Sequence, residues 1–405
     1  MFTRRRFILT LPALAAVPRI AAAQSFLTPF HKRPVPPQPV FVYFGTDTAK
    51  GVSKGIYLSR FDPASGLMTS PQLAAETLRP SFLALSPNTE GHRHLYATNE
   101  ATDASASVTS FLIADSATGA LRPINQVPSA GAGPCYVSLD ATGEAAFVAN
   151  YYGSSIASYR VLPSGALTGP IERIDYKNPK FGHRGPNAAR QDVPHPHSVH
   201  ISPDNRFLLV NDLGSDHISV FAIDPATARL GPPALFSNNR PGSGPRHIAF
   251  HPNGRWLYSI NELDSTIDRF LWTTTSSRTD PQGLLVNTGA PVKTIAPSFP
   301  VAKNTAAEVA ISLDGNFLYA SNRGEDSLVV FSIAPTDGAL TLVQRISCGG
   351  KIPRHFTLDP SERWLLCGNQ DSASITIFRR DSASGRIAGP TQFLPLDSPM
   401  FSLFA

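Results

Sequence analysis

The amino-acid sequence predicts an all-β protein: a seven-bladed β-propeller of four-stranded blades, with the ring closed by the C-terminal strand joining blade 1. Three observations predict this fold. The 405 residues include 37 Pro and 29 Gly but only 16% charged residues, which is typical of turn-rich β proteins. A short apolar strand that ends in polar residues recurs seven times. The seventh copy is complete by about Leu396, yet the residues from Pro399 onward again resemble a first strand.

The first 23 residues are expected to be a twin-arginine export signal. Arg4 to Arg6 precede a short apolar stretch, and three alanines precede a plausible cleavage site at Gln24. These are the parts of a removable signal, which predicts a periplasmic location. The apolar run is too short and too interrupted by proline for a stable membrane span, although an uncleaved anchor is the alternative. Residues 24–39 contain five prolines and are interpreted as an extended lead-in, so the propeller is expected over residues 40–405.

The charge of the chain comes largely from this signal. Its removal would leave 31 basic and 30 acidic residues, which lowers the net charge from +5 to +1. The remainder has no basic run, so we expect no nucleic-acid partner. Three cysteines, Cys135, Cys348 and Cys367, show no metal-type spacing and do not indicate a disulfide framework. The sequence sets no oligomeric state.

The repeat has a period of about fifty residues. Each copy contains a strand that opens with Pro, a returning strand, a third strand of alternating pattern and a weaker fourth strand, separated by turns. Four strands at this period predict propeller blades. The returning strands end in polar pairs: Thr46-Asp47, Asn99-Glu100, Asn150-Tyr151, Asn211-Asp212, Asn261-Glu262, Asn322-Arg323 and Asn369-Gln370. The six asparagines suit the turn at the strand end and are interpreted as structural.

The start of the first strand and the end of the second must lie on the same face of each blade, around the central channel. The residues after the opening prolines therefore join the polar pairs at one mouth. They are Ser81, Cys135, His197, Arg246, Arg354 and Met400, with Ala307 and Glu308 at this place in blade 6. One mouth of the channel is thus predicted to carry acids, arginines and histidines.

A proton acceptor between fixed cations suits the hydrolysis or rearrangement of a cyclic ester. The acceptor handles the proton of water, and arginines stabilise charge on the carbonyl oxygen or hold a substrate anion. The structural alternative is that Pro-Arg-His, which occurs at 245–247 and 353–355, closes neighbouring blades through Arg246 and Arg354.

The long connection from Glu172 to Pro194 carries several basic residues, Arg190 among them, and is expected to lie over the mouth, although a solvated surface insertion is the alternative. His195 and His197 share one face of the following strand, whereas His200 points away. This spacing gives too few ligands, so no metal site is predicted.

The sequence resembles the lactonase family of seven-bladed propellers, which includes bacterial 6-phosphogluconolactonases and fungal carboxymuconate-lactonizing enzymes. The resemblance covers about residues 40–405. It rests on Ala149-Asn150-Tyr151, Arg190-Gln191, Pro194-His195-Pro196-His197-Ser198, Asp212-Leu213-Gly214, Gly244-Pro245-Arg246-His247, Asn261-Glu262, Ser321-Asn322-Arg323-Gly324 and Pro353-Arg354-His355.

The resemblance implies four active-site residues, His197, Arg246, Glu262 and Arg323, which also belong to the predicted mouth. Their neighbours at the mouth are predicted to bind substrate: His195, Tyr151, Glu308, Arg354 and Arg190. The resemblance implies no metal and no cofactor. The export signal departs from cytosolic sugar-phosphate lactonases and favours an unphosphorylated lactone.

The resulting hypothesis is a lactonase that opens a small sugar or organic-acid lactone by water attack. Glu262 is the expected base, or His197 if Glu262 binds substrate, and Arg246 and Arg323 stabilise the oxyanion. Two alternatives remain open: a lactonizing isomerase, and a propeller that binds a partner without catalysis.

Overall fold

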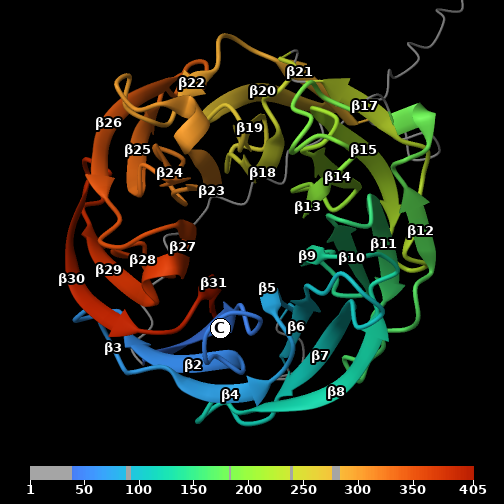
Figure 1. The fold of residues 1–405 in the computed structure, drawn as a ribbon, viewed down its shortest axis with the longest axis horizontal. Helices are drawn as coiled ribbons and strands as arrows, with labels where there is room; N and C mark the ends of the chain where they lie inside the picture. Colours follow the sequence, from blue (N-terminus) through green and yellow to red (C-terminus); the bar gives the residue numbers. More distant parts are fainter. Residues whose placement is uncertain (1–38, 88–92, 182–183, 238–239, 276–282) are drawn as a thin grey trace, which may run out of the picture. The chain divides into compact units, whose positions relative to one another are not determined.

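The computed structural model describes residues 39–87, 93–181, 184–237, 240–275 and 283–405, in which 31 strands form seven antiparallel sheets around a ring (Figure 1). Each sheet is one blade, so the predicted all-β propeller is confirmed. The predicted export signal, and the lead-in except for Pro39, lie outside the described residues. No helix in the described ranges is long and apolar enough to cross a membrane.

The first strand of each blade lies nearest the channel and the fourth lies on the outside of the ring (Figure 1). From the inside outward, blades 1 to 3 consist of β31 (Pro399–Phe404), β1 (Val40–Thr46), β2 (Gly55–Asp62) and β4 (Gln72–Glu76) with the short β3 (Leu67–Met68); β5 (Pro80–Leu85), β6 (His94–Asn99), β7 (Ser107–Ile113) and β8 (Leu121–Pro128); and β9 (Pro134–Leu139), β10 (Ala145–Asn150), β11 (Ser155–Arg160) and β12 (Glu172–Asp175).

The other four blades repeat the same order. They consist of β13 (Pro196–Ile201), β14 (Phe207–Asp212), β15 (His217–Asp224) and β17 (Ala234–Ser237) with the short β16 (Arg229–Leu230); β18 (Pro245–Phe250), β19 (Trp256–Asn261), β20 (Thr266–Thr274) and β21 (Gly283–Asn287) with the short β22 (Val292–Lys293); β23 (Thr305–Ile311), β24 (Phe317–Arg323), β25 (Ser327–Ile333) and β26 (Leu340–Ser347); and β27 (Pro353–Leu358), β28 (Trp364–Asn369), β29 (Ser374–Arg380) and β30 (Ile387–Pro395). Three short 3-10 helices complete the described elements: η1 (Pro179–Phe181), η2 (Val301–Lys303) and η3 (Gln370–Ser372).

The two ends of the propeller meet in blade 1. The C-terminal strand β31 pairs antiparallel with β1, so that Val42 lies opposite Phe404 and Tyr43 opposite Leu403. Blade 1 therefore takes its innermost strand from the end of the chain, as the sequence predicts. This pairing covers the edge of β1, which would otherwise expose unpaired backbone groups.

Tyrosines of the second strands connect neighbouring blades. The hydroxyl of Tyr43 in blade 1 donates to the carbonyl of Gly119 in blade 2 at 2.6 Å, and that of Tyr258 in blade 5 donates to Gly338 in blade 6 at 2.7 Å. Gly338 has a φ of 76°, and a Cβ there would lie 2.7 Å from the ring of Trp256, so glycine is required at this turn. The same bond recurs between blades 2 and 3 and between blades 6 and 7.

A β-bulge marks the place where each first strand leaves the mouth. In blade 5 the pairing passes from Pro245 directly to His247, which leaves Arg246 without a partner in the ladder. His197 and Arg354 occupy the same place in blades 4 and 7. A bulge changes the direction of a side chain relative to a regular strand. The repeat therefore places a bulge at the mouth in every blade.

The connection between blades 3 and 4 differs in part from the prediction. Glu172–Asp175 forms β12, the fourth strand of blade 3, so the connection begins only after this strand. The strand forms because Ile174 pairs with Ile156 and joins the core between blades. The stretch between the strand-end residues Asn261 and Asn322 contains a third strand of nine residues (β20) and two further strands that pair with it, β21 and β22.

Candidate active site

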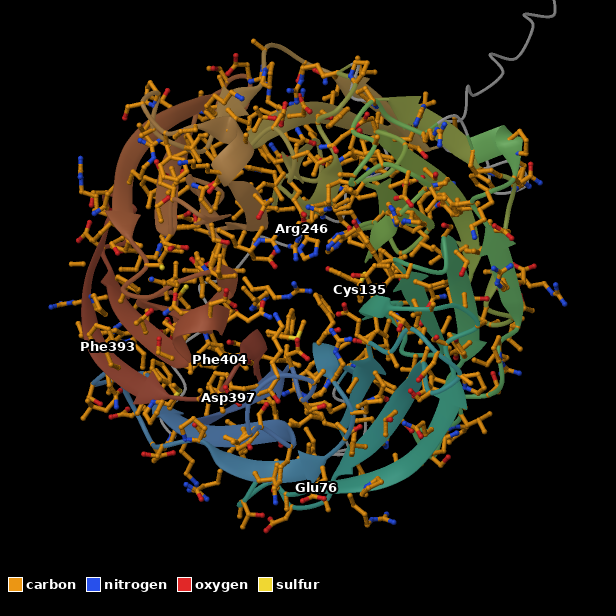
Figure 2. All side chains as sticks on the ribbon, viewed as in Figure 1. Glu76, Cys135, Arg246, Phe393, Asp397 and Phe404 are labelled. Atoms are coloured by element: carbon orange, nitrogen blue, oxygen red, sulfur yellow. The ribbon has the colours of Figure 1, made fainter. Side chains whose placement is uncertain are left out.

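The mouth of the channel holds a pocket of about 560 Å³. Figure 2 shows Arg246 and Cys135 at the inner side of the ring and Glu76 and Phe393 at its periphery. The pocket is lined by Glu100, Tyr151, Tyr152, Ala188, Ala189, Arg190, Asp192, His195, His197, Glu262, Arg323 and Arg354. Seven of the nine residues predicted for the site are in this lining; Arg246 and Glu308 are not.

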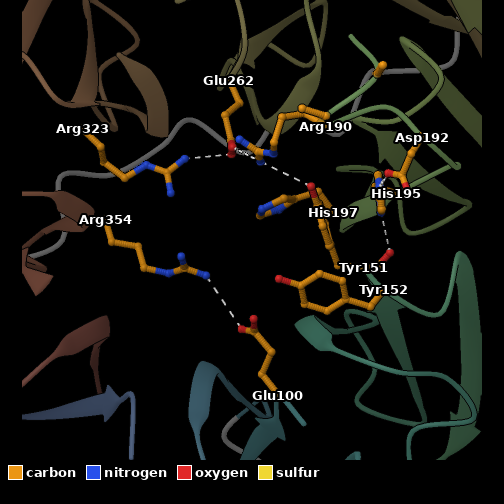
Figure 3. A pocket seen from close by; sticks show the side chains of 12 residues that line it. Glu100, Tyr151, Tyr152, Arg190, Asp192, His195, His197, Glu262, Arg323 and Arg354 are labelled. Carbon is orange, nitrogen blue, oxygen red and sulfur yellow. Dashed lines mark hydrogen bonds and ion pairs between the residues drawn. The ribbon is translucent and has the colours of Figure 1, made fainter. Parts of the chain in front are cut away.

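Glu262, which directly follows β19, is enclosed by three guanidinium groups, and Figure 3 shows two of them, those of Arg323 and Arg190. Its Oε2 lies 2.8 Å from Nη2 of Arg323, and its Oε1 lies 2.5 Å from Nη2 of Arg190. Nε of Arg246 is 3.0 Å from Oε2, although the pair is not aligned for a hydrogen bond. Only 3% of the Glu262 side chain is exposed.

These cations decide the protonation state of Glu262. Burial alone would raise the pKa of its carboxyl, but Arg323, Arg190 and Arg246 together hold that pKa far below its usual range. A carboxylate stabilised in this way keeps its charge and is a weak proton acceptor. The geometry therefore favours an electrostatic role for Glu262 over the role of general base.

His197 has the features of the alternative base. Its Nδ1 is buried without a hydrogen-bond partner among the described residues, so Nε2 is the ring nitrogen open to the pocket. Burial lowers the pKa of His197 well below its usual value, and Arg246, His247 and Arg354 add to this effect. The imidazole is therefore neutral at physiological pH and able to accept a proton. The thiol of Cys135 donates to the backbone carbonyl of His197 at 3.2 Å and fixes its position from blade 3.

His195 forms a wall of the pocket together with Tyr151. The two rings stack with centroids 4.3 Å apart and planes 13° apart. Nδ1 of His195 lies 2.9 Å from the carbonyl oxygen of Tyr151, and Nε2 lies 3.0 Å from a carboxylate oxygen of Asp192. Because both ring nitrogens already have partners, the arrangement supports a positioning role for His195.

The segment before β13 places Arg190 at the pocket. Gln191, which is fully buried, donates to the carbonyl of Leu213 at 2.9 Å and accepts from the backbone N–H of Asn187 at 3.0 Å. The bond to Leu213 attaches the segment to the turn after β14 of blade 4, and the bond from Asn187 holds the segment in its own turn. Arg190 then reaches both Glu262 and the hydroxyl of Tyr151, at 3.3 Å for the latter. The expectation that this connection contributes to the mouth agrees with the position of Arg190.

Arg246 and Glu308 line a second, smaller cavity, which Arg354 shares with the mouth pocket. Glu308 accepts from Nδ1 of His247 at 3.0 Å and lies 3.5 Å from Nε2 of His355. Its position thus gives no support to the expected contact with substrate. Arg246 also donates to the carbonyl of residue 307 in blade 6. Arg246 therefore combines the blade-closing contact of the structural alternative with its ion pair to Glu262.

Five lining residues were not predicted as site residues: two alanines of the connection before β13, and Glu100, Tyr152 and Asp192, whose side chains are polar or aromatic. Glu100 belongs to the ring of residues after the second strands, but nothing in the repeat separates it from Asp47, which lies outside the pocket. Tyr152 follows the polar pair by one position, and Asp192 lies in the connection before β13. Their place at the pocket depends on how the turns and the connection fold over the mouth.

The described parts of the chain contain no group of three or more His, Cys, Asp or Glu residues placed to hold a metal ion. Cys135, Cys348 and Cys367 are buried and free. Burial raises the pKa of the Cys135 thiol, with a further contribution from Glu100, so this thiol stays protonated and is no candidate nucleophile.

Comparisons with known proteins agree with this architecture. The family model described as Lactonase, 7-bladed beta-propeller, matches residues 41–404. A protein of Formosa agariphila named 6-phosphogluconolactonase is 35% identical over 358 residues, which cover 85% of this chain and 94% of the relative. The Bacillus subtilis protein of the same name is 29% identical and covers 85% and 92%. The solved structure of a periplasmic gluconolactonase from Pseudomonas aeruginosa superimposes with a TM-score of 0.80, at 32% identity, covering 91% of this chain and 99% of that one.

Proposed function

The chain belongs to the lactonase family of seven-bladed β-propellers, and from this premise we propose that it is a hydrolase that opens a small lactone by the attack of water. The two most informative relatives are named for the hydrolysis of a lactone. Their names favour hydrolysis over the cyclisation of an unsaturated acid and over binding without catalysis.

One observation carries the proposal: a neutral imidazole opens into a pocket that arginines line. In this mechanism Nε2 of His197 accepts a proton as water attacks the lactone carbonyl. Arg323 donates a hydrogen bond to the oxygen on which negative charge develops. The ring C–O bond then breaks, and the protonated His197 returns its proton to the leaving alkoxide. Water is consumed and one hydroxy acid is formed.

The low basicity of His197 is compatible with this role. Besides burial, the groups that lower its pKa are mainly arginines, with His247 contributing. The oxyanion of the tetrahedral intermediate carries the opposite charge and faces the same arginines. Formation of the oxyanion offsets the effect of the arginines on the pKa of His197, so His197 becomes a stronger base as the reaction proceeds.

The charges of the lining favour an unphosphorylated substrate. Three arginines in the pocket wall are matched by three acids: Arg190, Arg323 and Arg354 against Glu100, Asp192 and Glu262. A phosphate group of about two negative charges calls for a larger cationic excess. We therefore propose a lactone without a phosphate.

We also propose that the protein acts in the periplasm. The twin-arginine start of the sequence supports this location, as does the name of the Pseudomonas aeruginosa relative. Replacing Arg4 and Arg5 by lysine should retain the protein in the cytoplasmic fraction, because twin-arginine export depends on that pair. Immunoblots of periplasmic and cytoplasmic fractions measure the result, and unchanged export would contradict it.

The hydrolytic function is tested with His197→Gln. We expect kcat for D-glucono-1,5-lactone, measured above the uncatalysed rate, to fall by roughly 10²- to 10⁴-fold, the usual contribution of a general base. The far-ultraviolet circular dichroism should match that of the unchanged protein. Turnover equal to that of the parent would remove His197 from the mechanism, and the absence of turnover by the parent across a panel of lactones would refute the function.

A further inference from the structure

Across the pocket from Glu262, a carboxylate and a guanidinium face each other without a hydrogen bond. Glu100 follows β6 in blade 2, and Arg354 is the second residue of β27 in blade 7. Figure 3 shows the two side chains directed toward each other, with His197 above them. Nη2 of Arg354 and Oε2 of Glu100 are 3.8 Å apart, which exceeds a hydrogen-bond distance.

The carboxylate of Glu100 is nine-tenths buried, and the described residues do not satisfy both of its oxygens. Its side chain is 10% exposed, and Oε2 has no hydrogen-bond partner among the described residues. The other oxygen, Oε1, lies 4.0 Å from Nη2 of Arg79. A buried carboxylate oxygen without a donor is unfavourable, so the site calls for a group that supplies one.

We propose that Glu100 and Arg354 form a subsite for a hydroxyl group of the substrate, and that Glu100 thereby selects hydroxylated lactones. A hydroxyl both accepts and donates on one oxygen. Placed between the two side chains, it accepts from the guanidinium and donates to the carboxylate. A substrate carboxylate or phosphate would be repelled by Glu100, and an ammonium group by Arg354.

The neighbouring wall fits the same class of substrate. Tyr152 lines the pocket and is 54% exposed, so its ring offers an apolar surface next to the polar subsite. A sugar ring presents hydroxyls at its edge and C–H groups on its face, which match a polar pair beside an aromatic ring. The inference rests on the proposed function and narrows it: the side of the substrate away from the Glu262 cluster carries a neutral hydroxyl.

The subsite is tested with two lactones of the same ring size, D-glucono-1,5-lactone and δ-valerolactone, which lacks hydroxyls. Glu100→Ala should lower kcat/KM for the glucono-lactone at least tenfold, mainly through a higher KM, and change it less than twofold for δ-valerolactone. Glu100→Gln, which keeps an acceptor without the charge, should fall between. Glu76→Ala, at an exposed carboxylate of the outer strand β4, is the matched control and should equal the parent.

Binding of the two corresponding lactams, measured by calorimetry, separates this inference from the proposed function, because lactams resist hydrolysis. D-glucono-1,5-lactam should bind the parent at least tenfold more tightly than Glu100→Ala, whereas 2-piperidone should not distinguish them. If Glu100→Ala lost the same affinity for both lactams, or lost affinity for neither, the proposed subsite would be overturned. Selective lactam binding without lactone turnover would instead refute the hydrolytic function while retaining the subsite. No binding of the glucono-lactam by the parent would also overturn the subsite.

Discussion

Two carboxylates at the same mouth have opposite surroundings. Glu262 has three guanidinium groups within 3.0 Å, whereas the cation nearest to Glu100 is 3.8 Å away and Oε2 of Glu100 accepts no hydrogen bond from the described residues. Both side chains are nearly inaccessible to solvent, so exposure does not explain the difference.

The difference indicates that the two carboxylates have different roles: Glu262 preorganises the site, whereas Glu100 recognises the substrate. Glu262 already holds its partners and serves to fix the arginines of neighbouring blades, among them Arg323, in a defined geometry. Glu100 retains an unused acceptor, which a bound molecule can satisfy. A residue whose hydrogen bonds are already made within the protein is thus a poor candidate for substrate selection, whatever its charge.

Acid should produce the largest effect, because the buried histidines around the mouth take up protons in the unfolded chain but stay neutral in the folded one. Burial lowers the pKa of His200 to about 3 and that of His355 to about 4, and it lowers the pKa values of His197 and His247 well below 6.5. The unfolded chain binds protons from about pH 6.5 downward, whereas the folded chain does not. Stability is therefore complete above pH 6.5 and falls below it, by about 1.4 kcal/mol per pH unit for each of these histidines.

Urea denaturation at pH 7.5, 6.0 and 5.0 measures this slope. Above pH 5 the contribution of carboxylates is small, since their unfolded pKa values lie near 4. His200→Gln removes one buried imidazole outside the pocket. It should reduce the slope of the unfolding free energy against pH by the contribution of about one proton. Stability that is constant from pH 7.5 to 5.0 would contradict the inference that these histidines are neutral in the folded protein.

Glu262→Gln should have the next largest effect. It leaves Arg246, which is 2% exposed, beside Arg323 without the carboxylate that forms an ion pair with both. Removing one partner of a buried ion pair costs roughly 3–5 kcal/mol, and we expect the free energy of unfolding to fall by this amount. Urea denaturation at pH 7.5, above the histidine titration, gives the value.

The smallest losses of stability are expected from substitutions at Glu100 and Arg190. Glu100→Gln removes no hydrogen bond and should alter the free energy of unfolding by less than about 1 kcal/mol. Arg190→Gln should also cost about 1 kcal/mol or less, because its side chain is 38% exposed and two guanidiniums still hold Glu262. If Glu100→Gln and Glu262→Gln were equally destabilising, the proposed division between a fixed and an open carboxylate would be wrong.

The repeat predicted most of the fold because blade formation is local. Each blade is built from strands that follow one another along the chain, and alternation with turns is visible in a single copy. Even the closure by β31 follows from counting, since blade 1 lacks a first strand and the chain ends with one. The start of the connection between blades 3 and 4 was not predicted correctly, because the strand Glu172–Asp175 is short and its pairing with β11 depends on packing.

The sequence by itself determined the blades, the closure and the set of side chains at one mouth, because a strict repeat brings equivalent positions to equivalent places. The repeat alone did not distinguish Glu262 from Glu100, which occupy the same position in two blades, and only the family resemblance singled out Glu262. Only the tertiary structure decided that Arg190, Arg246 and Arg323 converge on one carboxylate and leave the other open. The physical reason is that charge pairing acts between blades, over distances that bear no relation to separation along the chain.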